Sequence, residues 1–252
     1  DPLVGEEDSS ALRTPEQAET LARITAFVAE AEPHAAPDAV CAWIDRGRAE
    51  SAPRYWTVDP IDGTKGFLRG DQYAVALALV VGGQVQIGVL GCPNLIDGWR
   101  PDFTGPGSLV AAVRGEGTWA SRLEGPRQFT RLHVSARREP TQARLLRSFE
   151  AGHTNTGQIG ALIEALGVEA EPVRMDSQAK YAVLAAGQGD ALVRLLSPKA
   201  PEYREKIWDQ AAGALVVEEA GGRITDLTGA PLDFTRGRTL AANRGVLATN
   251  GL

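Results

Sequence analysis

The chain has 252 residues, 43% of them hydrophobic and 23% charged, so it can bury a large core as one big domain or two moderate ones. A net charge of −6 argues against a general binder of nucleic-acid backbone, because such binding needs a basic surface that displaces counterions. The apolar run at 74–81 is far shorter than the ~18 residues of a membrane span, so no membrane partner is expected.

The two cysteines, Cys41 and Cys92, match no metal-binding spacing. We interpret them as free thiols in a reducing compartment, which favours a cytoplasmic location. No disulfide is expected between them.

The first predicted element is a helix over 15–32. Thr14 to Gln17 form a capping box with Pro15 at the first helical position. The residues expected on its apolar face follow a three-and-four spacing and are Leu21, Ile24, Phe27, Val28 and Ala31. We interpret this helix as scaffold.

An antiparallel meander is predicted next. A strand at 55–58 ends in an Asp-Pro-Ile-Asp-Gly turn, and further strands are expected at 73–81, 84–91 and 108–114. Gly82 and Gly83 are typical of a hairpin turn between the second and third of these strands.

The pattern changes after His133 to alternating helices and strands. Helices are predicted at 156–166, 177–186 and 207–220, and strands near Val173 and at 191–196 and 223–226. This alternation predicts a second, α/β unit, and we place the boundary near Ala136.

Three acidic stretches are candidates for chemistry. Glu6 and Glu7 lie in a Gly-Glu-Glu-Asp-Ser segment, Asp59 and Asp62 lie in the turn, and Asp209 opens a predicted helix. Each also has an ordinary interpretation, as a solvated loop, a polar turn and a helix start favoured by the helix dipole.

The turn is the most informative of the three. Asp59 and Asp62 repel each other, so a positive partner is needed, and a metal ion is the natural one. Thr64 and Lys65 follow Gly63 and can begin a short helix whose free backbone N–H groups bind an anion. Carboxylates facing phosphate-binding amides indicate a Mg²⁺–phosphate site and hydrolysis of a phosphate ester.

These motifs together resemble a known family. The blocks 5-GEED-8, 59-DPIDGTKGF-67 and 208-WDQAAG-213 are similar, in this order, to the lithium-sensitive, Mg²⁺-dependent phosphatases that include inositol monophosphatase and fructose-1,6-bisphosphatase. Within that superfamily the chain is more similar to the 3'(2'),5'-bisphosphate nucleotidases. The segments that carry this closer resemblance are 64-TKGFLRGDQYAVALALV-80, 91-GCPNL-95, 174-RMDSQAKYAVLAAG-187, 203-YREKIWD-209 and 236-RGRTLAANRGV-246.

The resemblance implies a layered α/β/α/β/α sandwich and two or three Mg²⁺ ions, with inhibition by Li⁺. The implied metal ligands are Glu6, Asp59, the backbone carbonyl of Ile61, Asp62 and Asp209. Glu6 and Asp59 would bind one ion, and Asp62 and Asp209 a second, with Asp59 as the bridge.

The same resemblance implies roles in catalysis and in substrate binding. Glu6, Asp62 and Thr64 would be catalytic, with the Thr64 hydroxyl on the attacking water, and the amides of Gly63 and Thr64 would hold the scissile phosphate. The residues implied around the adenosine and its 5'-phosphate are His153, Asp176, Ser177, Lys180 and Arg194. Without the resemblance, Lys180 would be interpreted as a solvated helix residue and His153 as a loop residue.

The implied activity is removal of the 3'-phosphate of adenosine 3',5'-bisphosphate, with its sulfated precursor 3'-phosphoadenylyl sulfate as an optional second substrate, in sulfur assimilation. Two alternatives stay open: an inositol mono- or bisphosphate phosphatase, and a nucleotide-binding sensor with impaired catalysis. Residues 1–136 would carry most metal ligands, and 137–252 the nucleotide pocket and the last ligand.

One further expectation concerns the start of the chain. Members of the family carry helices and an aspartate, the partner of the Asp-Gly-Thr threonine, before the Gly-Glu-Glu motif, which here starts at Gly5. We therefore expect this sequence to omit an N-terminal segment of the natural protein.

Overall fold

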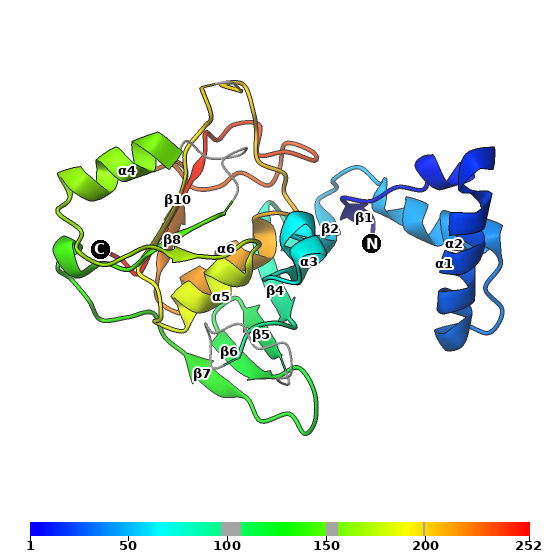
Figure 1. Ribbon diagram of the computed structural model, residues 1–252, viewed down its shortest axis with the longest axis horizontal. Coiled ribbons are helices and arrows are strands. Elements are labelled where there is room, and N and C mark those ends of the chain that lie inside the picture. Colours follow the sequence, from blue (N-terminus) through cyan, green and yellow to red (C-terminus); the bar gives the residue numbers. More distant parts are fainter. Residues whose placement is uncertain (97–106, 150–155, 199) are drawn as a thin grey trace.

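Two β-sheets enclose a layer of helices in the computed structural model, which describes residues 1–96, 107–149, 156–198 and 200–252 (Figure 1). The first sheet has the strand order β1-β2-β3-β4-β5-β6-β7 and the second the order β11-β12-β10-β8-β9. Helices α5 (Ala179–Ala185) and α6 (Ala211–Glu219) lie between the sheets, since α6 contacts strands of both. The predicted mixed α/β class is confirmed.

The first sheet is the predicted meander, extended at both edges. Its strands are β1 (Leu3–Gly5), β2 (Arg54–Asp62), β3 (Ala74–Val81), β4 (Gln84–Cys92), β5 (Ser108–Val113), β6 (Gly117–Arg122) and β7 (Thr130–Leu132). Strands β2 to β7 pair antiparallel in chain order, and β1 pairs parallel with β2. Gly82 and Gly83 have φ values of 58° and 80°, which confirms the predicted hairpin turn. The short strands β1, β6 and β7 were not predicted.

The second sheet follows the predicted alternation of helix and strand. Its strands are β8 (Leu145–Arg147), β9 (Val173–Arg174), β10 (Ala191–Arg194), β11 (Arg223–Thr225) and β12 (Val246–Thr249), and α4 (Thr156–Ala165) precedes β9. Strands β8, β9 and β10 are parallel, whereas β12 runs antiparallel between β10 and β11. Strands β8 and β12 were not predicted.

The layer of helices between the sheets is buried and largely apolar, with Lys180 of α5 as its charged exception. Every residue of α5 is buried, as are residues 211–217 of α6. Strand β4 approaches α6 so closely that a Cβ atom on Gly88 would lie 2.7 Å from the backbone oxygen of Ala212. One continuous hydrophobic cluster contains residues of both sheets, and the division near Ala136 stays a prediction. This packing fixes the start of α6, next to Asp209, against the first sheet.

Two N-terminal helices, α1 (Ala18–Ala31) and α2 (Pro37–Ile44), lie beside the two-sheet body (Figure 1). The helix predicted at 15–32 is confirmed, with a first turn of 3₁₀ type at Pro15–Gln17, although the Thr14 side chain makes no cap hydrogen bond. Its apolar face lies outside the core: no residue of α1 is buried, and Phe27 is 67% exposed. The reason is that α1 packs only against the short α2 and its neighbouring turns.

Both cysteines are buried free thiols, as predicted, and burial raises the pKa of Cys92 to about 12. In the part of the chain that the structure describes, no helix combines the length and the apolarity needed to cross a membrane.

Candidate active site

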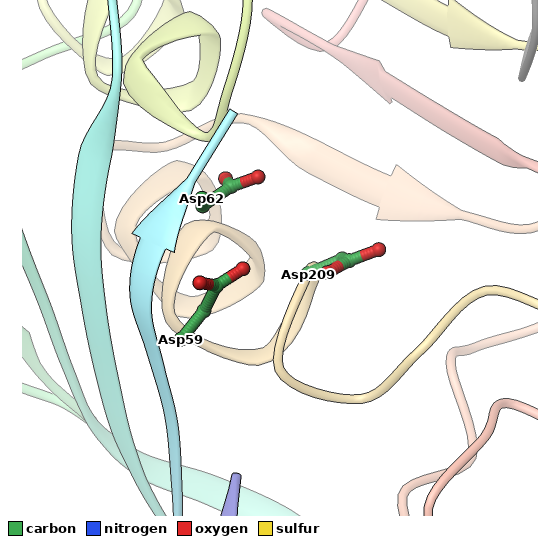
Figure 2. A group of neighbouring side chains, drawn as sticks. All are labelled: Asp59, Asp62 and Asp209. Carbon is green, nitrogen blue, oxygen red and sulfur yellow. The ribbon is translucent and has the colours of Figure 1, made fainter. Parts of the chain in front are cut away.

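Three aspartates from two distant parts of the chain meet at the edge of the first sheet. Carboxylate oxygens of Asp59, Asp62 and Asp209 lie within 4.8 Å of one another, and all three side chains point into one space (Figure 2). Asp59 is buried, and the other two are half-buried. This is the only group of three or more potential metal-binding side chains among the described residues.

A β-bulge brings Asp59 and Asp62 to the same side of β2. In a regular strand, side chains three residues apart point to opposite faces. Here Asp59 pairs with Ala76 but Asp62 pairs with Ala74, so three steps along β2 correspond to two along β3. The extra residue re-aims the second carboxylate, and the backbone N–H of Ile61 donates to Asp59 Oδ1 at 3.0 Å.

Gln178 joins Asp62 to the segment that carries Asp209. Its backbone N–H donates to Asp62 Oδ2 at 2.5 Å, and its side-chain amide donates to the carbonyl of Trp208 at 2.8 Å. Its side-chain oxygen accepts the N–H of Gly213 at 3.0 Å. Gln178 is buried, so these contacts fix the spacing of the two aspartates. The sequence analysis missed this residue.

Burial and close spacing disfavour the charged forms of the three aspartates. Burial and, to a smaller extent, the charges of the nearby Asp62 and Glu6 raise the pKa of Asp59 to about 10. Burial and the charge of Asp62 raise the pKa of Asp209 to about 8. The pKa of Asp62 is also raised by burial, although the charge of Lys180 opposes this shift. A bound cation would therefore favour the deprotonated forms of these carboxyl groups.

Glu6 lies next to the three aspartates but outside their tight group. It follows β1, where Gly5 is the register partner of Val58, and its backbone N–H donates to the Val58 carbonyl at 3.3 Å. Its exposed side chain reaches Asp59, with which it shares a hydrogen bond between carboxyl groups. A fourth carboxylate is thus available beside the cluster.

The turn predicted at 59–63 is wrong in part, because β2 continues through Asp62 and only Gly63 leaves the strand. The predicted short helix begins directly after Gly63, as α3 (Thr64–Arg69). Gly63 precedes it with a φ of 85°, a conformation that glycine adopts without strain. The Thr64 hydroxyl donates to the Ile61 carbonyl at 3.2 Å, so its oxygen lone pairs are left to accept another hydrogen bond.

The segment before α5 packs directly on this turn. Ser177 has a φ of 64°, the only positive value of a non-glycine residue in the described chain, and its hydroxyl accepts the N–H of Ala179 at 3.1 Å. Asp176 is buried and forms an ion pair with Arg69 of α3. The carboxylate of Asp176 thus already has a partner inside the protein.

The buried Lys180 and the half-buried Arg194 are two cations close to the aspartates. Lys180 Nζ donates to the carbonyls of Met175 at 3.2 Å and Ser177 at 2.8 Å. Burial and the nearby charge of Arg194 lower the pKa of Lys180 to about 8. Arg194 forms an ion pair of 2.9 Å with the buried Glu205. The interpretation of Lys180 as a solvated helix residue is therefore wrong.

The structure thus brings together most of the residues singled out in the sequence. Residues 6, 59, 61, 62, 63, 64 and 209 lie around the cluster, and 176, 177, 180 and 194 lie on the facing segments. His153 lies outside the described residues.

The sequence matches the family model described as the inositol monophosphatase family over residues 16–251. Three similar curated proteins are each named 3'(2'),5'-bisphosphate nucleotidase. The protein from Oryza sativa is 44% identical over 98% of this chain and 72% of its own length, and that from Schizosaccharomyces pombe is 41% identical over 98% and 73%. The protein from Dictyostelium discoideum is 37% identical over 100% and 75%.

Solved structures show the same fold. The Thermotoga maritima IMPase matches with a TM-score of 0.58 and 26% identity over 80% of this chain and 66% of its own. CysQ from Bacteroides thetaiotaomicron, described as a bacterial member of the inositol monophosphatase family, matches with a TM-score of 0.62 and 22% identity over 82% and 72%.

Proposed function

The chain belongs to the inositol monophosphatase family, and we propose that it is a Mg²⁺-dependent nucleotidase that removes the 3'-phosphate of adenosine 3',5'-bisphosphate, yielding AMP and phosphate. That it is a phosphatase of this family follows from relatives named 3'(2'),5'-bisphosphate nucleotidase, 37 to 44% identical to it over nearly all of its length. The observation that carries the proposal is the meeting of Asp59, Asp62 and Asp209 beside the short helix α3.

The donor set fits Mg²⁺. The family is metal-dependent, and the three aspartates offer the hard carboxylate oxygens that Mg²⁺ prefers. The raised pKa values of Asp59 and Asp209 support this assignment, because a bound cation would stabilise their charged forms. We assign Glu6, Asp59, the carbonyl of Ile61, Asp62 and Asp209 as the ligands of two or three ions. Bound ions would acidify a water molecule and stabilise the departing alkoxide.

The turn after β2 would position the reacting groups. The Thr64 hydroxyl donates to the Ile61 carbonyl, so its oxygen can accept a hydrogen bond from the attacking water and orient a water lone pair toward phosphorus. The amides of Gly63 and Thr64 would hold oxygens of the scissile phosphate. Glu6 and Asp62 complete the catalytic set as ligands that orient this water.

The nucleotide would bind between α3 and the start of α5. The buried Lys180 and the half-buried Arg194 repel each other, and an anionic 5'-phosphate would relieve this repulsion. Asp176, Ser177 and His153 complete the proposed nucleotide site. The ion pair of Asp176 with Arg69 supports an indirect role, in which Asp176 fixes α3 against the nucleotide segment.

A phosphate-release assay over a substrate panel tests the proposal. The panel contains adenosine 3',5'-bisphosphate, 3'-phosphoadenylyl sulfate, adenosine 3'-monophosphate and inositol 1-phosphate, each with Mg²⁺ and with EDTA. We expect the first to have the highest kcat/KM, the second to be a further substrate, and EDTA to abolish turnover of all. Li⁺ should inhibit at lower concentrations than Na⁺ or K⁺, because a small cation can occupy a Mg²⁺ position.

Two other results would overturn the proposal. Preferential turnover of inositol phosphate would make the protein an inositol phosphatase. Tight binding of adenosine 3',5'-bisphosphate without phosphate release at saturating Mg²⁺ would make it a nucleotide sensor.

A further inference from the structure

Arg238 contacts the segments of Glu6 and of Asp209 at the same time. It lies in the loop between β11 and β12, and its guanidinium donates to the backbone carbonyl of Gly5, directly before Glu6. The same guanidinium carbon lies 4.8 Å from the ring centroid of Trp208, directly before Asp209. One side chain therefore links two parts of the proposed metal site that are far apart in the sequence.

The backbone around Arg238 is also attached to the Asp209 segment. The carbonyl of Arg238 accepts the N–H of Ile207 at 3.2 Å, and the N–H of Leu240 donates to the carbonyl of Glu205 at 2.8 Å. The loop at 238–240 and the segment at 205–207 are thus paired like two short antiparallel strands. These backbone hydrogen bonds fix the position of the Arg238 Cα atom relative to the segment of Asp209.

The guanidinium of Arg238 also contacts the backbone segment at Gly47 to Ala49. Arg238 donates to the carbonyls of Gly47 at 3.0 Å and Ala49 at 3.4 Å. The backbones of Gly5 and Gly47 touch, since a Cβ atom on Gly5 would lie 3.4 Å from Gly47 Cα. The guanidinium therefore binds two backbone segments, at Gly5 and at Gly47, that are already in contact with each other.

An arginine is suited to this position and a lysine is not. A guanidinium is planar, carries five N–H donors in a fixed arrangement and stacks on an aromatic ring, whereas an ammonium group directs three donors from a single point. The side-chain acceptors recorded for Arg238 are all backbone carbonyls. Its charge is thus not paired with the carboxylates that would bind the metal.

We propose that Arg238 is a positioning residue that holds Glu6 at the distance from Asp209 at which both carboxylates serve the Mg²⁺ site. The inference rests on the proposed function for the identity of the cation, but it does not depend on the identity of the substrate. Residues that orient metal ligands from behind typically contribute 10- to 100-fold to metal affinity.

Calorimetric titration of Mg²⁺ into the substrate-free protein tests this inference. Arg238→Lys keeps the charge and the alkyl stem but loses the planar donors, so its dissociation constant for Mg²⁺ should rise about 10-fold or more. Arg236→Ala is the matched control, because Arg236 is exposed in the same loop and pairs with Asp233 at 3.1 Å. The control should bind Mg²⁺ like the original protein.

Activity gives a second readout. For Arg238→Lys the Mg²⁺ concentration at half-maximal rate should rise by the same factor, while kcat at saturating Mg²⁺ stays within about 3-fold, because excess metal can refill a loosened site. Unchanged Mg²⁺ affinity in Arg238→Lys would overturn the inference, whatever happens to turnover. If the nucleotidase assay fails but Arg238→Lys still weakens Mg²⁺ binding, the positioning role stands and the substrate proposal falls.

Discussion

Gly63 and Ser177 press against each other: a Cβ atom on Gly63 would lie 2.8 Å from Ser177 Cβ and 3.2 Å from its backbone nitrogen. Both residues adopt left-handed backbone conformations, with φ values of 85° and 64°. The turn proposed to hold the phosphate and the segment proposed to hold the nucleotide are therefore in direct contact at their most constrained residues.

Gly63→Ala should lose kcat/KM by at least about 100-fold, because the new methyl group pushes the two segments apart and small misplacements are costly in an active site. Gly70→Ala is a matched control: Gly70 ends α3 with a φ of 74° and has nothing within 4 Å of its Cβ position. Both variants should lose about 1 to 2 kcal/mol of stability from backbone strain. Equal kcat/KM values for Gly63→Ala and Gly70→Ala would contradict the proposed role of the contact between Gly63 and Ser177. Steady-state kinetics and thermal unfolding measure both effects.

Asp59→Asn should reduce turnover at millimolar Mg²⁺ by more than about 100-fold, since even residues behind the ligands contribute 10- to 100-fold. The same change removes an acid whose burial opposes ionisation, so the EDTA-treated variant should unfold at a higher temperature than the original protein at pH 8. Asp38→Asn, at an exposed position of α2, should change neither property. Near-original turnover by Asp59→Asn would show that Asp59 is not a ligand.

The metal-free protein should lose stability as the pH rises. The pKa values of Asp209 and Asp59 are raised from 3.8 to about 8 and about 10, so their contribution is complete below about pH 4 and is lost as the pH rises through these values. The loss should grow from pH 5 to pH 9, because both carboxyl groups bind their protons more tightly in the folded than in the unfolded chain. Urea unfolding in EDTA at pH 5, 7 and 9 measures it.

Mg²⁺ should reverse this trend, since the cation binds the deprotonated carboxylates and stabilises the folded state more at higher pH. Asp59→Asn should lose much of the pH dependence. An unfolding free energy in EDTA that stays constant from pH 5 to 9 would contradict the raised pKa values.

Lys180→Met should raise the KM for adenosine 3',5'-bisphosphate by about 10- to 100-fold, because a charged hydrogen bond contributes roughly 1.5 to 3 kcal/mol. The KM for adenosine 3'-monophosphate, which lacks the 5'-phosphate, should change little. Arg194→Met should act in the same direction but also lower stability, since it leaves the buried Glu205 without its partner. A parallel rise for both substrates would show that Lys180 does not bind the 5'-phosphate.

Local signals in the sequence predicted that the strand ends at Val58 and that Asp59 to Gly63 form a turn, because proline and glycine are typical of turns. In the structure, β2 continues through Asp62 and only Gly63 leaves the strand. The bulge that turns both aspartates to one side could not be predicted, because it depends on the pairing of β2 with β3. The outward face of α1 was missed for a related reason: a helical pattern shows which residues are apolar but not whether another element covers them.

The residues that organise the site depend on distant partners and gave no local signal. Gln178 accepts a hydrogen bond from Gly213, 35 positions away, and Arg238 donates to Gly5 across 233 positions. A buried glutamine looks in sequence like any helix residue, and an arginine in a Gly-rich loop looks like a solvated charge. Their roles emerge only from the three-dimensional arrangement.

The position of β12 inside the second sheet has a consequence for biosynthesis. Strands β10 and β11 are synthesised before β12 and pair with it on opposite sides. In this sheet β10 and β11 do not pair with each other. Until the ribosome has released Val246 to Thr249, the nascent chain therefore carries two facing strand edges with unpaired backbone groups. Such edges are binding sites for chaperones and starting points for aggregation. Translational pauses before this strand should accordingly lower the yield of folded protein more than pauses in the N-terminal helices, a difference that synonymous-codon variants can measure.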